Sequence, residues 1–331
     1  MLNEEFTGVW ATPQLVGRKE QLNQIVQLAR QAEKLPRVIF VEGEGGIGKT
    51  RLLLAALEQL RSHNDICVAR QLIDLYHVTH HTTDGFMYAL SDVLPDNRRW
   101  FANYWRARDQ LVRLRLAGRV QEIDRQSVAV RKAFTADVLR LAESHRLVWA
   151  LDTLEKLTYA LLGTGVSAED IGSSWTWLCQ QLPRWKNVVL ILAGRQSANP
   201  LWQQLEAIQG LQTDRVPLAA FTAEETIEYF EAVTRLAETQ DRQTYKRLQA
   251  LPGDARQRAH TLSQGRPILL SLFVDFLSIA PADKLVEIPS GDIHLPDDLV
   301  RKLINRFRES GPIGDTVLAL GRAPKGVDAE L

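Results

Sequence analysis

The chain contains the stretch Gly43-Glu44-Gly45-Gly46-Ile47-Gly48-Lys49-Thr50, which matches the pattern G-x-x-x-x-G-K-[ST] at every fixed position. It directly follows a strand-like apolar run at 38–41, and the next residues, 51–61, carry leucines at helical spacing. Glycine permits the tight turn that aims backbone N–H groups at phosphate oxygens, and the N-terminus of the following helix adds positive potential. This order of strand, loop and helix predicts a binding site for a nucleoside triphosphate.

Individual side chains of this stretch have predicted roles. Lys49 is expected to reach the β- and γ-phosphates, and the Thr50 hydroxyl is expected to bind Mg²⁺. The predicted cofactors are therefore ATP or ADP and Mg²⁺, and the absence of the guanine-reading pattern N-K-x-D favours adenine. We expect the nucleotide to contact Gly43, Glu44, Gly45, Gly46, Ile47, Gly48, Lys49, Thr50 and Arg51.

The composition argues against several classes of protein. Forty basic residues balance 40 acidic ones in 331, so the net charge predicts no bulk attraction to nucleic acid or to a membrane surface. The two cysteines are too few for a disulfide framework. The first residues lack a signal-peptide pattern, and no apolar run approaches the roughly 18 residues of a membrane span. We therefore expect a cytoplasmic protein without a membrane partner.

Further apolar runs predict the rest of the fold. Strand candidates at 66–73, 147–151, 188–193 and 215–218 alternate with helical patterns, and a helix is expected earlier, at 21–34. This pattern predicts an α/β fold, a P-loop NTPase core with a mostly parallel five-stranded sheet and helices on both faces. After Leu218 the pattern is helical, and it opens with a capping box at 222–225. An all-helical lid is predicted there, with helices near 222–234, 242–250, 254–263, 267–278 and 296–310.

Two carboxylates follow the strand candidate at 147–151. Asp152 ends that strand, which places an acid beside Mg²⁺ at the carboxyl edge of a parallel sheet, so we predict that it holds the metal together with Thr50. Glu155 is a candidate base that orients the attacking water. Alternatively, Glu155 only begins the next helix, where its charge suits the dipole. The residue next to Asp152 is Thr153, where many hydrolytic relatives have an acid.

The strand candidate at 188–193 runs into Gly194 and Arg195. A cation at the carboxyl end of a strand can sense the γ-phosphate and stabilise charge during transfer. The alternative is an arginine in a surface salt bridge. The predicted catalytic residues are Lys49, Asp152, Glu155 and Arg195.

One segment of the chain is strongly basic. Between 98 and 140, eleven basic residues stand against four acidic ones. We interpret the segment as two amphipathic helices with a solvated basic face. A nucleic-acid surface is the less favoured alternative, because the aromatic residues gather at one end: Trp100, Phe101, Tyr104 and Trp105.

A nearby histidine cluster without cysteine does not predict a zinc site: His77, His80 and His81.

Five short motifs occur in order along the chain: Val16-Gly17-Arg18, the loop at 43–50, Asp152-Thr153-Leu154-Glu155, Gly194-Arg195 and Gly265-Arg266-Pro267. In this order they resemble the STAND class of signal-transduction ATPases, relatives of the NACHT and NB-ARC switches and of the AAA+ origin-recognition ATPases. The resemblance covers nearly the whole chain. It implies that Val16, Gly17 and Arg18 lie near the adenine and that Pro267 contacts the base or sugar from the lid. As alternatives, Gly17 caps a turn and Pro267 opens a helix.

The resemblance also implies an order of domains. Residues 1–35 would form an N-terminal segment and helix that contribute to the adenine site, 36–220 the P-loop NTPase core and 221–312 the helical lid. Residues 313–331 would begin a winged-helix domain. The chain would then be the ATPase fragment of a larger signalling or defence protein, with sensor or effector domains beyond Leu331.

The predicted function is that of a regulatory switch that binds ATP and hydrolyses it slowly. Its nucleotide state would control conformation and self-association. Three alternatives stay open: a DNA-associated AAA+ ATPase, a P-loop small-molecule kinase that uses the basic segment 98–119 as a lid, and a nucleotide-binding scaffold that hardly hydrolyses. Nucleic acid is therefore an allowed partner, but it is not the favoured one.

Overall fold

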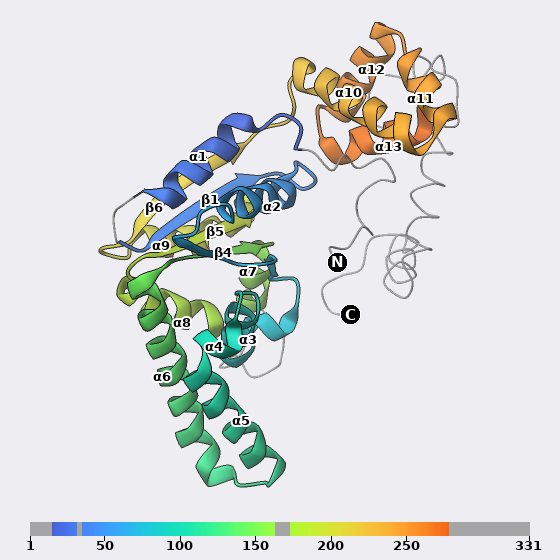
Figure 1. Cartoon of the computed structure of the whole chain (residues 1–331). Coiled ribbons are helices and arrows are strands. Elements are labelled where there is room, and N and C mark those ends of the chain that lie inside the picture. Colours follow the sequence, from blue (N-terminus) through green and yellow to red (C-terminus); the bar gives the residue numbers. More distant parts are fainter. Residues whose placement is uncertain (1–14, 32–34, 163–172, 278–331) are drawn as a thin grey trace. The chain divides into compact units, whose positions relative to one another are not determined.

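The computed structural model describes residues 15–31, 35–162 and 173–277. The described residues group into two compact units (Figure 1). The first comprises residues 18–45 and 49–219, with the gaps just given, and the second comprises 15–17, 46–48 and 220–277. The domain limits expected from the sequence stay a prediction.

A parallel sheet is the framework of the first unit. Its strands lie in the order β2-β4-β5-β1-β6, and β3 pairs with β4 as well. Every described strand pair is parallel. The predicted fold class is confirmed, with helices on both faces of this sheet. The strands are β1 (Arg37–Gly43), β2 (Ile66–Val68), β3 (Ile73–Asp74), β4 (Arg146–Asp152), β5 (Val188–Gly194) and β6 (Gln212–Leu218).

The predicted number of five strands is wrong, because the sheet has six strands within the described residues. The run at 66–73 forms two short strands that both follow β4, with Val68 opposite Val148 and Ile73 opposite Leu151. Between them, the backbone N–H of Arg70 donates to the carbonyl oxygen of Val93, at 2.7 Å. The chain therefore stops pairing with β4 for a few residues between β2 and β3. Both strands lie on the same edge of the sheet.

The apolar pattern of the strands explains their positions. All seven residues of β5 are buried, as are six of seven in β4, because helices cover both faces of a central strand. On β1, Phe40 stacks on Trp202 with ring centroids 5.2 Å apart. The edge strand β6 is more polar and contains Pro217, which an edge strand tolerates because fewer of its N–H groups pair.

Two helices, α1 (Lys19–Arg30) and α2 (Lys49–Leu60), pack side by side against the sheet (Figure 1). The large aromatic core lies on the other face, where Trp149 and Trp185 are fully buried. The remaining helices of the unit are α3 (Thr83–Asp92), α4 (Asn97–Trp100), α5 (Ala102–Leu116), α6 (Val120–Ser144), α7 (Glu155–Leu162), α8 (Ser173–Gln181) and α9 (Asn199–Glu206). Short 3-10 helices are η2 (Val78–His81), η3 (Leu182–Arg184) and η4 (Gln196–Ala198).

The two helices expected in the basic segment are confirmed as α5 and α6, which form a hairpin that runs out from the sheet (Figure 1). A fully buried carboxylate, that of Asp137 on α6, holds the start of α5. It accepts hydrogen bonds from the backbone N–H groups of Asn103 and Tyr104, at 3.1 and 2.9 Å, and it pairs with Arg140. Because the first N–H groups of a helix have no partner within the helix, Asp137 caps α5 from the neighbouring helix.

The second unit is helical. Its helices are α10 (Ala223–Gln240), α11 (Arg242–Gln249), α12 (Gly253–Ser263) and α13 (Pro267–Leu277). The predicted capping box is confirmed, since Thr222 and Glu225 exchange side-chain to backbone hydrogen bonds at the start of α10. Residue Gly265 has φ +67°, and a Cβ there would lie 2.3 Å from the Phe221 carbonyl oxygen, so this position requires glycine.

Several expectations fall outside the described residues. These are the helix at 296–310, the beginning of a winged helix at 313–331 and the first 14 residues of the N-terminal segment. Within the described part of the chain, no helix is long and apolar enough to cross a membrane.

Candidate nucleotide-binding site

The glycine-rich stretch links β1 to α2 at the carboxyl edge of the sheet. Lys49 begins α2 and is 9% exposed. Its Nζ donates to the carbonyl oxygens of Gly43 and Glu44, at 2.7 and 2.8 Å. Burial lowers the pKa of Lys49, although the nearby carboxylates of Glu155 and Asp152 oppose that shift. The ammonium is thus a buried cation held within its own loop.

The next residue contacts the predicted metal carboxylate. The Thr50 hydroxyl donates to Oδ2 of Asp152, at 2.6 Å, and the backbone N–H of Thr153 donates to Oδ1, at 2.8 Å. Burial raises the pKa of Asp152, and these hydrogen bonds oppose the shift. The structure therefore brings together the hydroxyl and carboxylate oxygens that the sequence proposes for Mg²⁺.

A further carboxylate belongs to this edge of the sheet. Asp74 ends β3 and lies in register with Asp152 on β4. Its Oδ1 accepts a hydrogen bond from the Thr153 hydroxyl, at 2.5 Å. Thr153 has φ +59°, a left-handed conformation that is strained for a β-branched residue, and its hydroxyl also donates to the Asp152 carbonyl oxygen. Sequence reasoning missed Asp74, although Ile73-Asp74 is an apolar strand that ends in a carboxylate, the signal that identified Asp152.

The candidate base and the candidate sensor are paired with each other. Glu155 Oε1 lies 3.2 Å from Nε of Arg195, and Oε2 accepts the Arg195 backbone N–H at 3.2 Å. The Glu155 side chain is 8% exposed, whereas that of Arg195 is 58% exposed. A Cβ on Gly45 would lie 2.9 Å from the Arg195 guanidinium, so this cation also lies against the glycine-rich loop.

These groups fit a magnesium nucleotide. The glycine-rich backbone, a buried ammonium and an arginine suit phosphate oxygens. Thr50 and Asp152 supply two oxygens, and Mg²⁺ is usually held by one or two carboxylates, phosphate oxygens and water. Within the described residues, no group of three or more histidines, cysteines and acids could hold a metal by itself.

The other residues predicted to contact the nucleotide have contacts within their own unit. Arg18 has φ +65°, and its guanidinium donates to the carbonyl oxygen of Ala219. Gly17 has φ +59°, and a Cβ there would lie 2.6 Å from Glu225 Oε1, so a local turn already requires this glycine. Pro267 begins α13. Val16 is buried in the core of the helical unit. The proposed contacts of these residues with adenine stay predictions.

Other candidates have structural roles. The rings of His80 and His81 hydrogen-bond the carbonyl oxygens of Asp74 and Leu75, both at 2.7 Å. In the basic segment, Phe101, Tyr104 and Trp105 are at most 4% exposed, so they are not available to stack on bases.

The comparisons with known proteins agree with this site. Residues 14–165, less than half of the chain, match the family model described as AAA ATPase domain. No curated protein sequence matches. The ORC2 protein of Aeropyrum pernix in its ADP form is similar, with 14% identity, a TM-score of 0.50, and coverage of 90% of this chain and 70% of that chain. Drosophila ORC bound to DNA has 16% identity, a TM-score of 0.49, and coverage of 89% and 67%.

At such low identity, the structural likeness concerns the fold alone. The matched residues contain the glycine-rich loop, Asp152 and Glu155. This segment of the chain is therefore similar to an AAA ATPase domain, which supports nucleotide binding at the loop.

Proposed function

We propose that the chain is an ATP-binding regulatory switch of the STAND class that hydrolyses ATP slowly. In this proposal, Lys49 binds the β- and γ-phosphates and Thr50 and Asp152 hold Mg²⁺, which neutralises phosphate charge. The nucleotide state controls conformation and self-association.

The observation that carries the proposal is the pair formed by Glu155 and Arg195. Both carboxylate oxygens of Glu155 are engaged, one by the Arg195 guanidinium and the other by the Arg195 backbone N–H, so while this pair persists the carboxylate is not available to orient water. The neighbouring residue Thr153 supplies no second acid. The arrangement therefore favours retention of ATP over rapid turnover.

The same pair provides a sensor for the γ-phosphate. Arg195 lies against Gly45 of the phosphate loop and is more than half exposed, so its guanidinium can exchange Glu155 for a phosphate oxygen. Glu155 is then free to orient water. A switch also needs a different affinity for nucleotide in its two conformations, because a ligand that binds both equally shifts neither. The residues proposed to contact adenine, Val16 and Gly17 of the N-terminal segment and Pro267 of the lid, are the proposed source of that difference.

The test begins with the nucleotide content of the purified chain, measured by acid release and chromatography. Size-exclusion chromatography with light scattering then follows the mass in ADP, ATP and a slowly hydrolysed ATP analogue. We expect retained ADP, and a change of mass or hydrodynamic radius with the analogue that Lys49→Ala abolishes. If the chain binds nucleotide but has the same mass and hydrodynamic radius in ADP, ATP and the analogue, the switch is contradicted. The chain would then be only a nucleotide-binding ATPase.

A further inference from the structure

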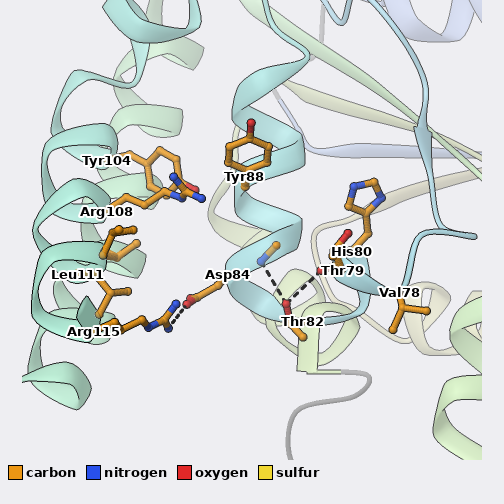
Figure 2. Close-up of a pocket in the computed structure, with 13 residues that line it drawn as sticks. Val78, Thr79, His80, Thr82, Asp84, Tyr88, Tyr104, Arg108, Leu111 and Arg115 are labelled. Carbon is orange, nitrogen blue, oxygen red and sulfur yellow. Dashed lines mark hydrogen bonds and ion pairs between the residues drawn. The ribbon is translucent and has the colours of Figure 1, made fainter. Parts of the chain in front are cut away.

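A cavity of about 630 Å³ lies in the sheet-containing unit, away from the glycine-rich loop. One wall is formed by η2 and α3 and the other by α5 and α6 of the helical hairpin (Figure 2). Its volume is in the range that holds a small organic ligand. None of the residues placed at the nucleotide site lines it.

The inner wall of this cavity is apolar. Tyr104, Leu111 and Val130 line it and are at most 2% exposed. Tyr88 and Val112 line it as well and are 38% and 39% exposed, so the cavity has an accessible rim. Removing a ligand's apolar surface from water against these side chains favours binding.

The charges around the cavity do not cancel. Arg115 pairs with Asp84 at 2.9 Å, which neutralises both (Figure 2). Burial lowers the pKa of His80, which favours its neutral form. Arg108 is half-buried, and no carboxylate among the described residues pairs with it. One positive charge therefore remains at the cavity.

Arg108 is held in place without being neutralised. Its guanidinium lies 4.7 Å from the ring centroid of Tyr88 and 5.5 Å from that of Trp105. Such contacts orient a cation over aromatic faces, but they leave its N–H groups free to bind an anion. The side chain points into the space beside Tyr104 (Figure 2).

We propose that this cavity binds a small amphipathic anion, a molecule with an apolar body and a single carboxylate or sulfonate group. The body packs against Tyr104, Leu111 and Val130, and the anionic group binds the guanidinium of Arg108. This inference does not depend on the proposed switch function, because it rests on residues outside the nucleotide site.

Two fluorescent probes of similar size test the proposal. One is the anion 1-anilinonaphthalene-8-sulfonate, and the other is the neutral N-phenyl-1-naphthylamine. Arg108→Gln removes the charge and should weaken sulfonate binding about tenfold while the neutral probe binds as before. Val112→Trp narrows the rim and should weaken both probes.

The matched control is Arg106→Gln, which removes the same charge from an exposed position on α5 that does not line the cavity. This variant should leave the affinities for both probes within about twofold of wild type, since salt screens the exposed charge of Arg106. Circular dichroism melts and ATP binding establish that each variant is folded. The proposal is overturned if the wild type binds neither probe, if Val112→Trp changes neither affinity, or if Arg108→Gln and Arg106→Gln weaken the sulfonate equally.

Discussion

The nucleotide site and the cavity beside the hairpin differ in whether their charged groups have polar partners. At the nucleotide site, Lys49 is bound by loop carbonyls, Asp152 by Thr50, and Arg195 by Glu155. At the cavity, Arg108 is held by aromatic rings and has no carboxylate partner among the described residues.

The difference teaches how each site would respond to a ligand. In the proposed switch, a nucleotide would exchange existing internal contacts, so its binding would rearrange side chains and could control a conformation. An anion at Arg108 would add a contact to a charge that has no carboxylate partner among the described residues, with little rearrangement. In our proposals, the first site is therefore suited to switching and the second to simple binding.

We expect the largest effect from removing Lys49, the buried cation of the nucleotide site. Lys49→Ala deletes contacts to two phosphates, each worth about 2 kcal/mol for a charged group, so affinity for ATP should fall about a thousandfold. Isothermal titration with ATP measures it. The sulfonate probe should bind this variant as it binds the wild type, and loss of both ligands would mean that the variant is misfolded.

The second change concerns the helical hairpin beside the cavity: Asp137→Ala removes the carboxylate that caps α5. The backbone N–H groups of Asn103 and Tyr104, the latter buried, would lose their acceptor, which should lower the free energy of unfolding by about 3 kcal/mol. Urea unfolding measures this loss. Asp137→Asn keeps one acceptor oxygen and should lose about half as much; equal losses would argue against the capping role.

A third change separates binding from turnover. Glu155→Gln should leave ATP affinity nearly unchanged, because Glu155 contacts Arg195 rather than the loop, and should slow hydrolysis about a hundredfold. Single-turnover phosphate release provides the measurement. Unchanged turnover would remove Glu155 from the mechanism.

The smallest effect is a pH dependence that the lowered pKa of Lys49 predicts. Phosphate binding requires the protonated ammonium, which is lost as pH rises through the lowered pKa. Affinity for ATP should therefore fall at a pH below the ordinary lysine value of 10.5, by about tenfold per pH unit. Lys49→Arg stays charged in this range and should lack the fall. The same fall in both proteins would assign it to another group.

Much of the nucleotide site was predictable from local patterns. The spacing of Gly43, Gly48, Lys49 and Thr50 and the strand that ends in Asp152 needed no knowledge of distant contacts. Asp74 was not recognised because its strand has only two residues and follows a break at Arg70. A strand that short has no periodicity to detect.

The pairing of Glu155 with Arg195 could not be predicted from spacing either. The two residues are 40 positions apart, and they meet because β4 and β5 are neighbours in the sheet. The same reasoning applies to Asp137, which the sequence presents as one more acid in a basic helix and the structure places fully buried at the start of α5.

The sequence by itself determined the fold class and the place of the candidate phosphate loop, because phosphate binding depends on a short run of glycines with a lysine and a threonine, and a parallel sheet depends on apolar runs that alternate with helices. Only the tertiary structure decided which charges are paired, which aromatic residues are buried and where a cavity with an unneutralised arginine lies. Those properties depend on distances between elements far apart in the chain, and chain packing alone sets such distances.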